Sequence, residues 1–283
     1  TTDQIMRNVM VALLPVAAFA VVLFGVSALA LILVCTATTV LTEHLVCVLT
    51  NRPTTVTDYS ALITGMLLAL TLPPGFPLWM GVAGGIVSIF LGKVLFGGLG
   101  FNIFNPALVG RAFLQACFTV AVTTWVPSFW PKFLSFERFT TFIPSTLTFP
   151  FTTPAPLNDF FASVDGWAGA TPLGLMKFEH HGTSALKLFG GMTSGSVGET
   201  SSLIILLCGA YLIRKRMMNW RIPASMLSSV FVVSLGFYIA NSDKYPGPFF
   251  MLFSGGLMLG AFFMATDMVT APTTPLGAWV YGG

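Results

Sequence analysis

The chain has 283 residues, of which 55% are hydrophobic and only 8% are charged. Soluble domains carry roughly 25% charged residues, so a soluble fold of this sequence would lack polar surface, whereas a lipid bilayer solvates apolar side chains directly. The net charge is only +3, and no basic stripe is interleaved with aromatic residues, which excludes a nucleic-acid partner. We therefore interpret the chain as an integral membrane protein.

Eight hydrophobic segments follow one another along the chain. They are 9–25, 27–49, 59–73, 78–97, 105–126, 198–213, 222–240 and 249–266. A straight spanning helix needs about 20 apolar residues, so the first two segments, which form one run, are expected to fold back at Gly25-Val26-Ser27. The third and sixth segments are short and bounded by Gly or Pro, which predicts discontinuous helices near the membrane centre.

The predicted fold is an all-α polytopic membrane bundle with two related, inverted-repeat-like halves. A loose repeat supports this prediction, because Gly98 to Asn102 leads to Asn105-Pro106 much as Gly260 to Phe263 leads to Asp267 and Pro272. We divide the chain into a first transmembrane half (1–126), an extracytoplasmic loop (127–197) and a second transmembrane half (198–283). The second half is expected to be truncated at its C-terminal end.

The orientation follows from the rule that basic residues gather on the cytoplasmic side. With Arg7 in the cytoplasm, alternation through the segments places the other clustered basic residues there too: Arg52, Lys93, Arg214, Lys215, Arg216 and Arg221. The same alternation puts loop 127–197 outside. A loop of this length without a helix pattern is more often functional or disordered than a simple connector.

That loop contains the run Asp165-Gly166-Trp167-Ala168-Gly169-Ala170-Thr171-Pro172. The small residues leave the hydroxyl of Thr171 uncrowded, and Pro172 biases Thr171 toward an extended backbone. Such a hydroxyl could accept a bulky group from another enzyme, although the residues alone favour an ordinary turn.

The whole chain resembles the family that contains the D subunit of Rnf complexes and the B subunit of the sodium-pumping NADH:quinone oxidoreductase. The matching stretches, besides the loop, are Ser60 to Ala69, Phe96 to Asn102, Asn105 to Arg111, Gly195 to Ser201 and Gly260 to Thr270. The resemblance implies that FMN is joined through its phosphate to Thr171, with Asp165, Gly169 and Ala170 in the recognition motif. The family usually has Ser or Thr three residues before the acceptor, where this chain has Ala168.

The resemblance also implies a function, cofactors and partners. The chain is expected to be a multi-pass component of the cytoplasmic (inner) membrane, with the flavin loop outside. It would relay electrons between ferredoxin and NAD and couple this to Na⁺ or H⁺ movement, without being a complete enzyme alone. Expected partners are the A, B, C, E and G subunits of the Rnf complex, a flavin transferase and the lipid bilayer. A second, noncovalent flavin (riboflavin) is a further expectation, without residues assigned to it.

Charged residues at the ends of apolar segments are candidates for an ion pathway, because a charge in hydrocarbon is costly and tends to be paired or functional. Glu199 and Asp267 are the two candidates, whereas Glu43 is better interpreted as a helix-terminal cap or a partner in a surface ion pair. Lys93 and Arg111 are expected to face phospholipid or a cofactor phosphate, of which phospholipid is favoured. No catalytic or metal-binding residue is assigned, and all four cysteines are expected to be buried apolar residues.

Two other functions stay open. A small-solute transporter or channel would suit the broken helices, and a scaffold protein would carry no cofactor. The outer loop discriminates, because neither alternative has a use for a flavin acceptor at Thr171.

Overall fold

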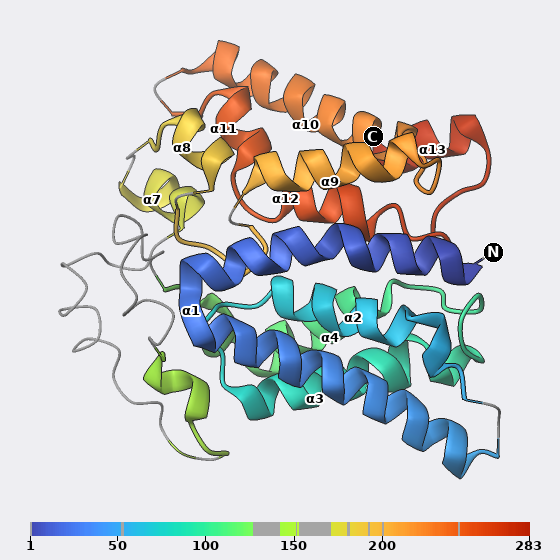
Figure 1. Ribbon diagram of the computed structural model, residues 1–283. Helices are drawn as coiled ribbons and strands as arrows, with labels where there is room; N and C mark the ends of the chain where they lie inside the picture. The colour runs from blue at the N-terminus through green and yellow to red at the C-terminus, as the bar shows by residue number, and fades with distance from the viewer. Residues whose placement is uncertain are drawn as a thin grey trace.

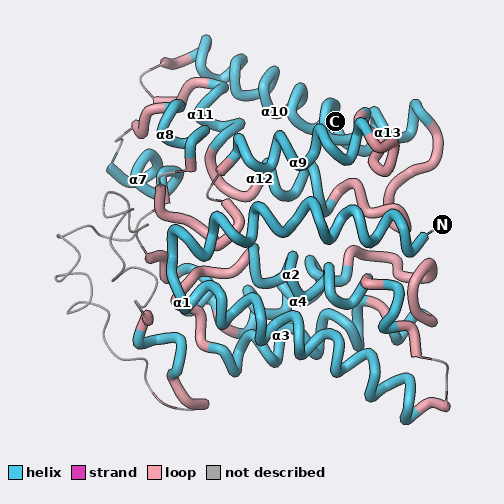
Figure 2. The backbone as a smooth tube through the Cα atoms, viewed as in Figure 1, coloured by secondary structure: helices cyan, strands magenta, loops and turns pink. Residues whose placement is uncertain are grey.

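The computed structural model describes residues 2–51, 54–126, 142–150, 152, 171–179, 182–191, 193–199, 201–242 and 244–283. Over these ranges the chain forms helices and no strands (Figures 1 and 2). The predicted all-α membrane bundle is therefore confirmed.

The chain begins with α1 (Thr2–Leu49), which is a hairpin of two helices rather than one rod. At Gly25 the backbone leaves the helix, with φ 69° and ψ −153°, a conformation open to glycine because it has no Cβ. Figure 1 shows the two arms running in opposite directions from this bend. Each arm is about 35 Å long at about 1.5 Å per residue, enough to cross a hydrocarbon core of about 30 Å. The predicted reversal at Gly25 is confirmed.

The rest of the first half packs along this hairpin. It comprises η1 (Val56–Asp58), α2 (Ser60–Leu70), α3 (Leu78–Gly92), η2 (Val94–Phe96), α4 (Pro106–Cys117) and α5 (Thr119–Thr123). With 11 residues, α2 is only about 16 Å long, so it reaches halfway through a membrane. Gly65 lets α2 approach α1 closely, since a Cβ there would lie 2.5 Å from the Cα of Thr36.

The later part of the chain contains shorter elements and one long helix. They are η4 (Pro144–Leu147), α7 (Pro172–Glu179), α8 (Ala185–Gly190), α9 (Ser202–Arg214), α10 (Arg221–Ala240), α11 (Pro248–Phe253), α12 (Leu257–Leu259), the π-helix η5 (Gly260–Met264) and α13 (Pro275–Gly282). The element from α11 to η5 is interrupted at Ser254–Gly256, where Gly255 has φ +70°. All eight predicted segments thus contain helix, and the discontinuous ones are as short as expected.

Three elements of the described residues are long and apolar enough to cross a membrane: the α1 hairpin, α3 with η2, and α10. Little of α10 is buried in the molecule, and Val232, Val233 and Phe237 on it are more than half exposed. Such apolar surface suits contact with lipid tails or with another membrane protein.

The two halves terminate each other's broken helices. The N–H groups of Val197 and Gly198 donate to the carbonyl oxygens of Leu72 and Leu70, at 3.0 and 2.7 Å, at the C-terminal end of α2. In the other direction, the side-chain amide of Asn105 donates to the carbonyl oxygen of Met264, at the end of η5, at 3.3 Å. Orphan carbonyl groups at helix ends must find donors. Here Asn105 of the first half supplies one to the second half, and Val197 and Gly198, at the start of the second half, supply two to the first. We call the place where these bonds join the two halves the crossing. That the halves derive from a repeat stays a prediction.

The N-terminus and the start of α13 lie at one end of the bundle, and the bend of α1, α7 and α8 lie at the opposite end (Figure 1). We call these the terminus end and the bend end. The end of α3 and the connection between α9 and α10 also lie at the terminus end, which brings Arg7, Lys93, Arg214, Lys215, Arg216 and Arg221 to the same side of the membrane. The described basic residues cluster as expected, and Arg52 lies outside the described residues. Which side faces the cytoplasm stays a prediction.

Candidate functional site

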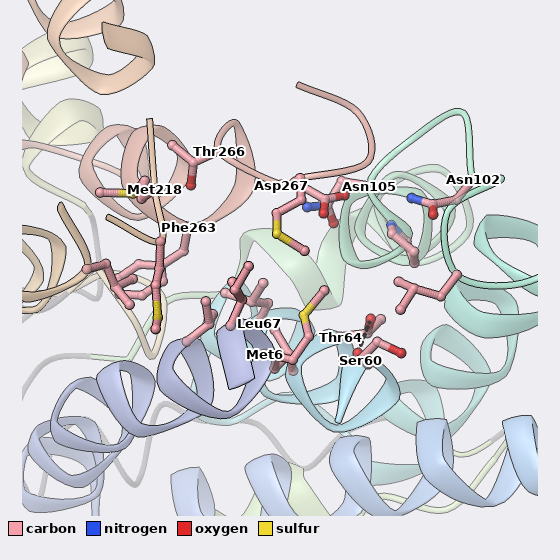
Figure 3. Close-up of a pocket in the computed structure, with 18 of the residues that line it drawn as sticks. Met6, Ser60, Thr64, Leu67, Asn102, Asn105, Met218, Phe263, Thr266 and Asp267 are labelled. Carbon is pink, nitrogen blue, oxygen red and sulfur yellow. Dashed lines mark hydrogen bonds between the residues drawn. The ribbon is translucent and has the colours of Figure 1, made fainter. Parts of the chain in front are cut away.

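A cavity of about 80 Å³ lies at the terminus end, between the two halves (Figure 3). We call it the methionine pocket. It is lined by the start of α1, by α2, by the segment before α4, by the end of η5 and by the turn between α9 and α10. Its lining includes Met6, Ser60, Thr64, Leu67, Lys93, Leu99, Asn102, Asn105, Met217, Met218, Phe262, Phe263, Thr266 and Asp267.

A glycine-rich turn after α3 brings the first polar group to this pocket. Gly97, Gly98 and Gly100 have φ values of +115°, +106° and +97°, which residues with a Cβ rarely adopt. The turn presents Asn102, whose amide nitrogen donates to the carbonyl oxygen of Phe104 at 3.2 Å. The other side-chain atom, Oδ1 of Asn102, is buried and accepts no hydrogen bond from the described residues. A buried acceptor without a donor is costly, so this oxygen suits a ligand that offers an N–H or O–H group.

Asn105 fixes the position of α4 and joins it to the second half. Its side-chain oxygen accepts from the N–H groups of Ala107 and Leu108, at 3.0 and 3.4 Å, while Pro106 begins the helix. This is the preferred arrangement for a helix start, because the side chain satisfies orphan N–H groups and proline needs no donor there. The amide nitrogen of the same side chain is then left free to bond Met264 across the crossing.

Asp267 supplies the only carboxylate among the residues that line the methionine pocket. Burial raises the pKa of this carboxyl, and hydrogen bonds from the N–H of Val269, the hydroxyl of Thr270 and the amide of Asn102 oppose that rise. Asp267 therefore lines a pocket, although its role in ion movement stays a prediction.

Lys93, which lines the pocket, belongs to a buried ion pair. The ammonium of Lys93, which is 2% exposed, donates to Oε1 of Glu43, which is 1% exposed, at 2.7 Å. It also donates to the hydroxyl of Ser60 and lies 3.8 Å from Oδ2 of Asp58. The prediction that Lys93 faces phospholipid is wrong, because α3 ends there and turns the side chain inward onto Glu43. Glu43 is thus the partner of an ion pair, but the pair is buried and not at the surface, where it was expected.

Glu199 lies elsewhere, beside the crossing at the end of α2. Its carboxylate accepts from the N–H of Ser196 at 3.3 Å and packs against Gly195 and Gly256, where added Cβ atoms would lie 2.9 and 3.2 Å from its oxygens. It does not line the methionine pocket, so the structure does not bring the two predicted ion-pathway residues into one site. A role in ion movement stays a prediction for both.

Thr171 lies at the bend end, at the start of α7. Its hydroxyl oxygen accepts from the N–H of Gly174 at 3.1 Å, and its carbonyl oxygen accepts from the N–H of Leu175 at 2.9 Å, so Thr171 caps the helix that Pro172 begins. The side chain is half-buried. The other predicted residues of the flavin motif, Asp165, Gly169 and Ala170, lie outside the described residues.

Apart from Asp267, sequence reasoning missed the polar groups of the methionine pocket. Asn102 and Asn105 were within a stretch that matched the family, and the glycines before them were a usable signal of a special turn. The methionines had no signal, because Met217 and Met218 reach the pocket from a turn between two helices. Of the cysteines, Cys35, Cys47 and Cys208 are buried as expected, whereas Cys117 is exposed near the end of α4, so that expectation is wrong.

Residues 1–283 match the model of a family described as NQR2, RnfD, RnfE. The chain belongs to this family. It is 40% identical to the D subunit of the Na(+)-translocating ferredoxin:NAD(+) oxidoreductase complex of Acetobacterium woodii, over 99% of this chain and 77% of the relative. It is 38% identical to the D subunit of the proton-translocating ferredoxin:NAD(+) oxidoreductase complex of Clostridium ljungdahlii, over 99% and 78%. The D subunit of an ion-translocating oxidoreductase complex of Stutzerimonas stutzeri is 39% identical, over 99% and 80%.

These comparisons confirm the family resemblance and, with the long apolar helices, establish the chain as a membrane protein. Two relatives of nearly equal similarity carry names with different ions, sodium and proton. Overall similarity therefore does not specify an ion for this member of the NQR2, RnfD, RnfE family.

Proposed function

We propose that the chain is the D subunit of an Rnf-type complex in the cytoplasmic (inner) membrane. It would relay electrons between ferredoxin and NAD through FMN bound covalently to Thr171, and this transfer would be coupled to the movement of Na⁺ or H⁺. The observation that carries the proposal is similarity to several such subunits over essentially the whole chain. The partners would be the A, B, C, E and G subunits of the Rnf complex and the flavin transferase that attaches the FMN.

The surroundings of Thr171 fit a phosphoester. An anion at the start of a helix is stabilised by the free N–H groups of the first turn and by the helix dipole, and the Thr171 hydroxyl already accepts from one of these N–H groups, that of Gly174. The side chain of Leu173, two residues later, packs beside Gly255 in the second half, where a Cβ would lie 3.0 Å away. The acceptor is thereby held against the bundle. FMN bound there would supply one-electron transfer chemistry.

The side chains that line the methionine pocket suit the ring system of a second, noncovalent flavin. Oδ1 of Asn102 would accept from a ring N–H group. The side chains of Met6, Met218 and Phe263 would pack against the rings. The sulfur atoms of the two methionines contact aromatic rings favourably. The carboxylate of Asp267 would repel a phosphate, which favours riboflavin over FMN. A cavity of about 80 Å³ is too small for three fused rings, so binding requires the flexible methionine side chains to move.

The two proposed flavin positions lie at opposite ends of the bundle. Thr171 begins α7 at the bend end, and the methionine pocket opens between α1, α2 and η5 at the terminus end (Figures 1 and 3). The basic clustering supports an orientation with the terminus end in the cytoplasm and the flavin loop outside. The chain would thus hold one electron carrier near each face of the membrane.

The attachment is tested by ultraviolet fluorescence of the protein on a denaturing gel after expression with the flavin transferase. We expect a fluorescent band for the parent, none for Thr171→Val, and a band for Thr171→Ser, which keeps a hydroxyl. Thr152→Val, at another threonine outside the helices, is the matched control and should fluoresce. A dark parent band, with the transferase shown to be active on another substrate, would refute the attachment.

The second flavin is tested separately by flavin released on denaturation. In the Thr171→Val background, a complex that binds riboflavin should release it in stoichiometric amount, and Asn102→Leu should reduce the amount by at least tenfold. If no flavin is released from either variant and none is attached at Thr171, a small-solute channel is the favoured interpretation of the same broken helices.

A further inference from the structure

The turn between α9 and α10 carries a cluster of basic residues without acidic partners. We call the segment 214–221 the basic turn, and its cations are Arg214, Lys215, Arg216 and Arg221. No Asp or Glu occurs between Thr200 and Ser242, and none of the four cations forms an ion pair with the described residues. The first three of them are exposed. The positive charge of the basic turn is therefore open to an anion from outside the chain.

The backbone of the basic turn places Arg216 where a glycine is usual. At the end of α9 the N–H of Arg216 donates to the carbonyl oxygen of Ile213 at 2.9 Å, and the N–H of Met217 donates to that of Leu212 at 3.0 Å. This pair of bonds is a Schellman motif, which needs a left-handed residue, most often glycine, at the position of Arg216. Arg216 has φ +56°. A side chain is strained in that conformation, so an arginine there favours a role for the guanidinium outside the fold.

Aromatic side chains flank the basic turn where it meets α13. The guanidinium of Arg221 lies 5.5 Å from the centre of the Trp220 ring, and the Trp220 ring meets the Trp279 ring edge to face at 6.1 Å. The two tryptophans are 48% and 42% exposed. Leu276 and Val280, on the same helix as Trp279, are exposed as well. Exposed tryptophans beside cations and aliphatic side chains are typical of the level of the lipid headgroups at a membrane surface.

We infer that the basic turn binds the phosphate headgroup of an anionic phospholipid, whose acyl chains lie along the exposed apolar side chains of α10 and α13. The positive charge alone would also suit an acidic protein. The exposed tryptophans and aliphatic side chains beside the charge favour a lipid, because a lipid presents an anionic group and apolar chains together. Juxtamembrane clusters of Lys and Arg recognise anionic lipids in this way.

The basic turn is also part of the wall of the methionine pocket. Met217 and Met218 lie between Arg216 and Arg221 in the sequence, and both line the pocket. A lipid that binds the cations therefore restricts the backbone that carries these two methionines. By reciprocity, any effect of the lipid on a ligand of the pocket equals the effect of that ligand on the lipid. The inference goes beyond the proposed function, since the lipid site does not depend on what the pocket binds.

The test uses the intact complex in nanodiscs of phosphatidylcholine, with and without phosphatidylglycerol, at constant ionic strength. One readout is the melting temperature, which rises when a ligand binds the folded state. The other is backbone hydrogen exchange in segment 212–221, which slows where local opening is restricted. We expect phosphatidylglycerol to raise the melting temperature and to slow this exchange in the parent. Inorganic phosphate added to phosphatidylcholine nanodiscs should do neither, because it brings no acyl chains.

Arg216→Gly is the most informative variant, because strain and lipid binding predict opposite effects. Glycine relieves the left-handed strain, so this variant should melt at or above the parent temperature in phosphatidylcholine alone. It should need about fivefold more phosphatidylglycerol for a half-maximal response, the effect expected for the loss of one cation. Arg216→Lys keeps the charge and should respond as the parent does. Lys244→Gln, at an exposed lysine beyond the other end of α10, controls for general attraction to anionic lipid and should also respond as the parent does.

A parent complex that does not respond to phosphatidylglycerol would overturn the inference, and so would equal responses in the parent and in Arg216→Gly. A response to inorganic phosphate alone would refute a lipid as the ligand. Loss of other subunits from Arg216→Gly, with an unchanged lipid response, would assign the cations to a protein partner instead. No readout needs a flavin. A complex without flavin that shows the lipid response refutes the proposed function alone, and a flavin-bearing complex without the response refutes this inference alone.

Discussion

Gly198→Ala perturbs the crossing at which the second half terminates α2. An added Cβ at Gly198 would lie 2.8 Å from the Cβ of Leu70 and 2.9 Å from its carbonyl oxygen, and the loop must move to relieve these contacts. That movement stretches the 2.7 Å hydrogen bond from Gly198 to the same carbonyl oxygen. Overpacking costs about 1–3 kcal/mol and the hydrogen bond about 1 kcal/mol. The expected loss of stability is therefore about 2–4 kcal/mol.

The assay is thermal unfolding of the purified protein in detergent, followed by tryptophan fluorescence. At about 2 °C per kcal/mol for a chain of this size, Gly198→Ala should melt roughly 4–8 °C below the parent. The matched control is Gly236→Ala in α10, where nothing lies within 4 Å of the added Cβ. Alanine is also the better helix former there, so this control should melt at or slightly above the parent temperature. Equal melting of Gly198→Ala and the parent would refute the tight packing of the crossing.

Further predictions concern the polar groups around the methionine pocket. Asn105→Asp keeps the helix cap but loses the donor to Met264, whereas Asn105→Ala loses both. In the same melting assay, Asn105→Asp should therefore be the more stable variant by about 1 kcal/mol. Lys93→Met alone leaves a buried carboxylate unpaired and should lower the stability of the protein by about 3–5 kcal/mol. Adding Glu43→Leu should restore at least half of that stability. If the two substitutions instead lower the stability additively, the buried pair is contradicted. The pKa of Asp267 is raised in the folded state, so the folded protein binds this proton more tightly than the unfolded chain does. The protonated carboxyl therefore stabilises the fold at low pH. This stabilisation is lost as pH rises from about 3.9 through the raised pKa. Asp267→Asn should flatten that part of the pH–melting profile, and an unchanged slope would show that other groups set it.

The fold was largely predictable because lipid imposes a simple rule on helix length. Segments long enough to span, or too short to do so, could be read from runs of apolar residues and the glycines and prolines between them. Gly25 illustrates this, since a run from Val9 to Thr50 could only fit the bilayer if it turned back near its middle. The π-helix at Gly260–Met264 had no such signal, because its hydrogen-bond register depends on its neighbours.

The site was less predictable because its contacts join residues far apart in the chain. Lys93 looked like a lipid-facing cation at the end of an apolar run, and only its pairing with Glu43, 50 residues earlier, makes it a buried residue. The bond from Asn105 to Met264 spans 159 residues. Thr171 was predicted as the flavin acceptor from its motif and not from its geometry. The structure adds its position at the start of a helix.

The crossings also bear on whether the predicted halves are independent units. The carbonyl groups of Leu70 and Leu72, at and just beyond the end of α2, accept from Gly198 and Val197. The carbonyl group of Met264, at the end of η5, accepts from Asn105 in the first half. In a membrane, an unsatisfied backbone group costs several kcal/mol, so either half alone would expose helix ends that lipid cannot satisfy. Fragments 1–126 and 142–283, expressed separately, should therefore be degraded or aggregated.

Expressed together, the same two fragments should copurify through a tag on either one, because each supplies the donors that the other lacks. Gly198→Ala in the second fragment should reduce this copurification, whereas Gly236→Ala should not. Two fragments that are each stable alone and do not associate would show that the hydrogen bonds of the crossing are dispensable. Association of the fragments that depends on Gly198 would instead show that the two halves form one folding unit. A substitution at either broken helix would then destabilise both halves.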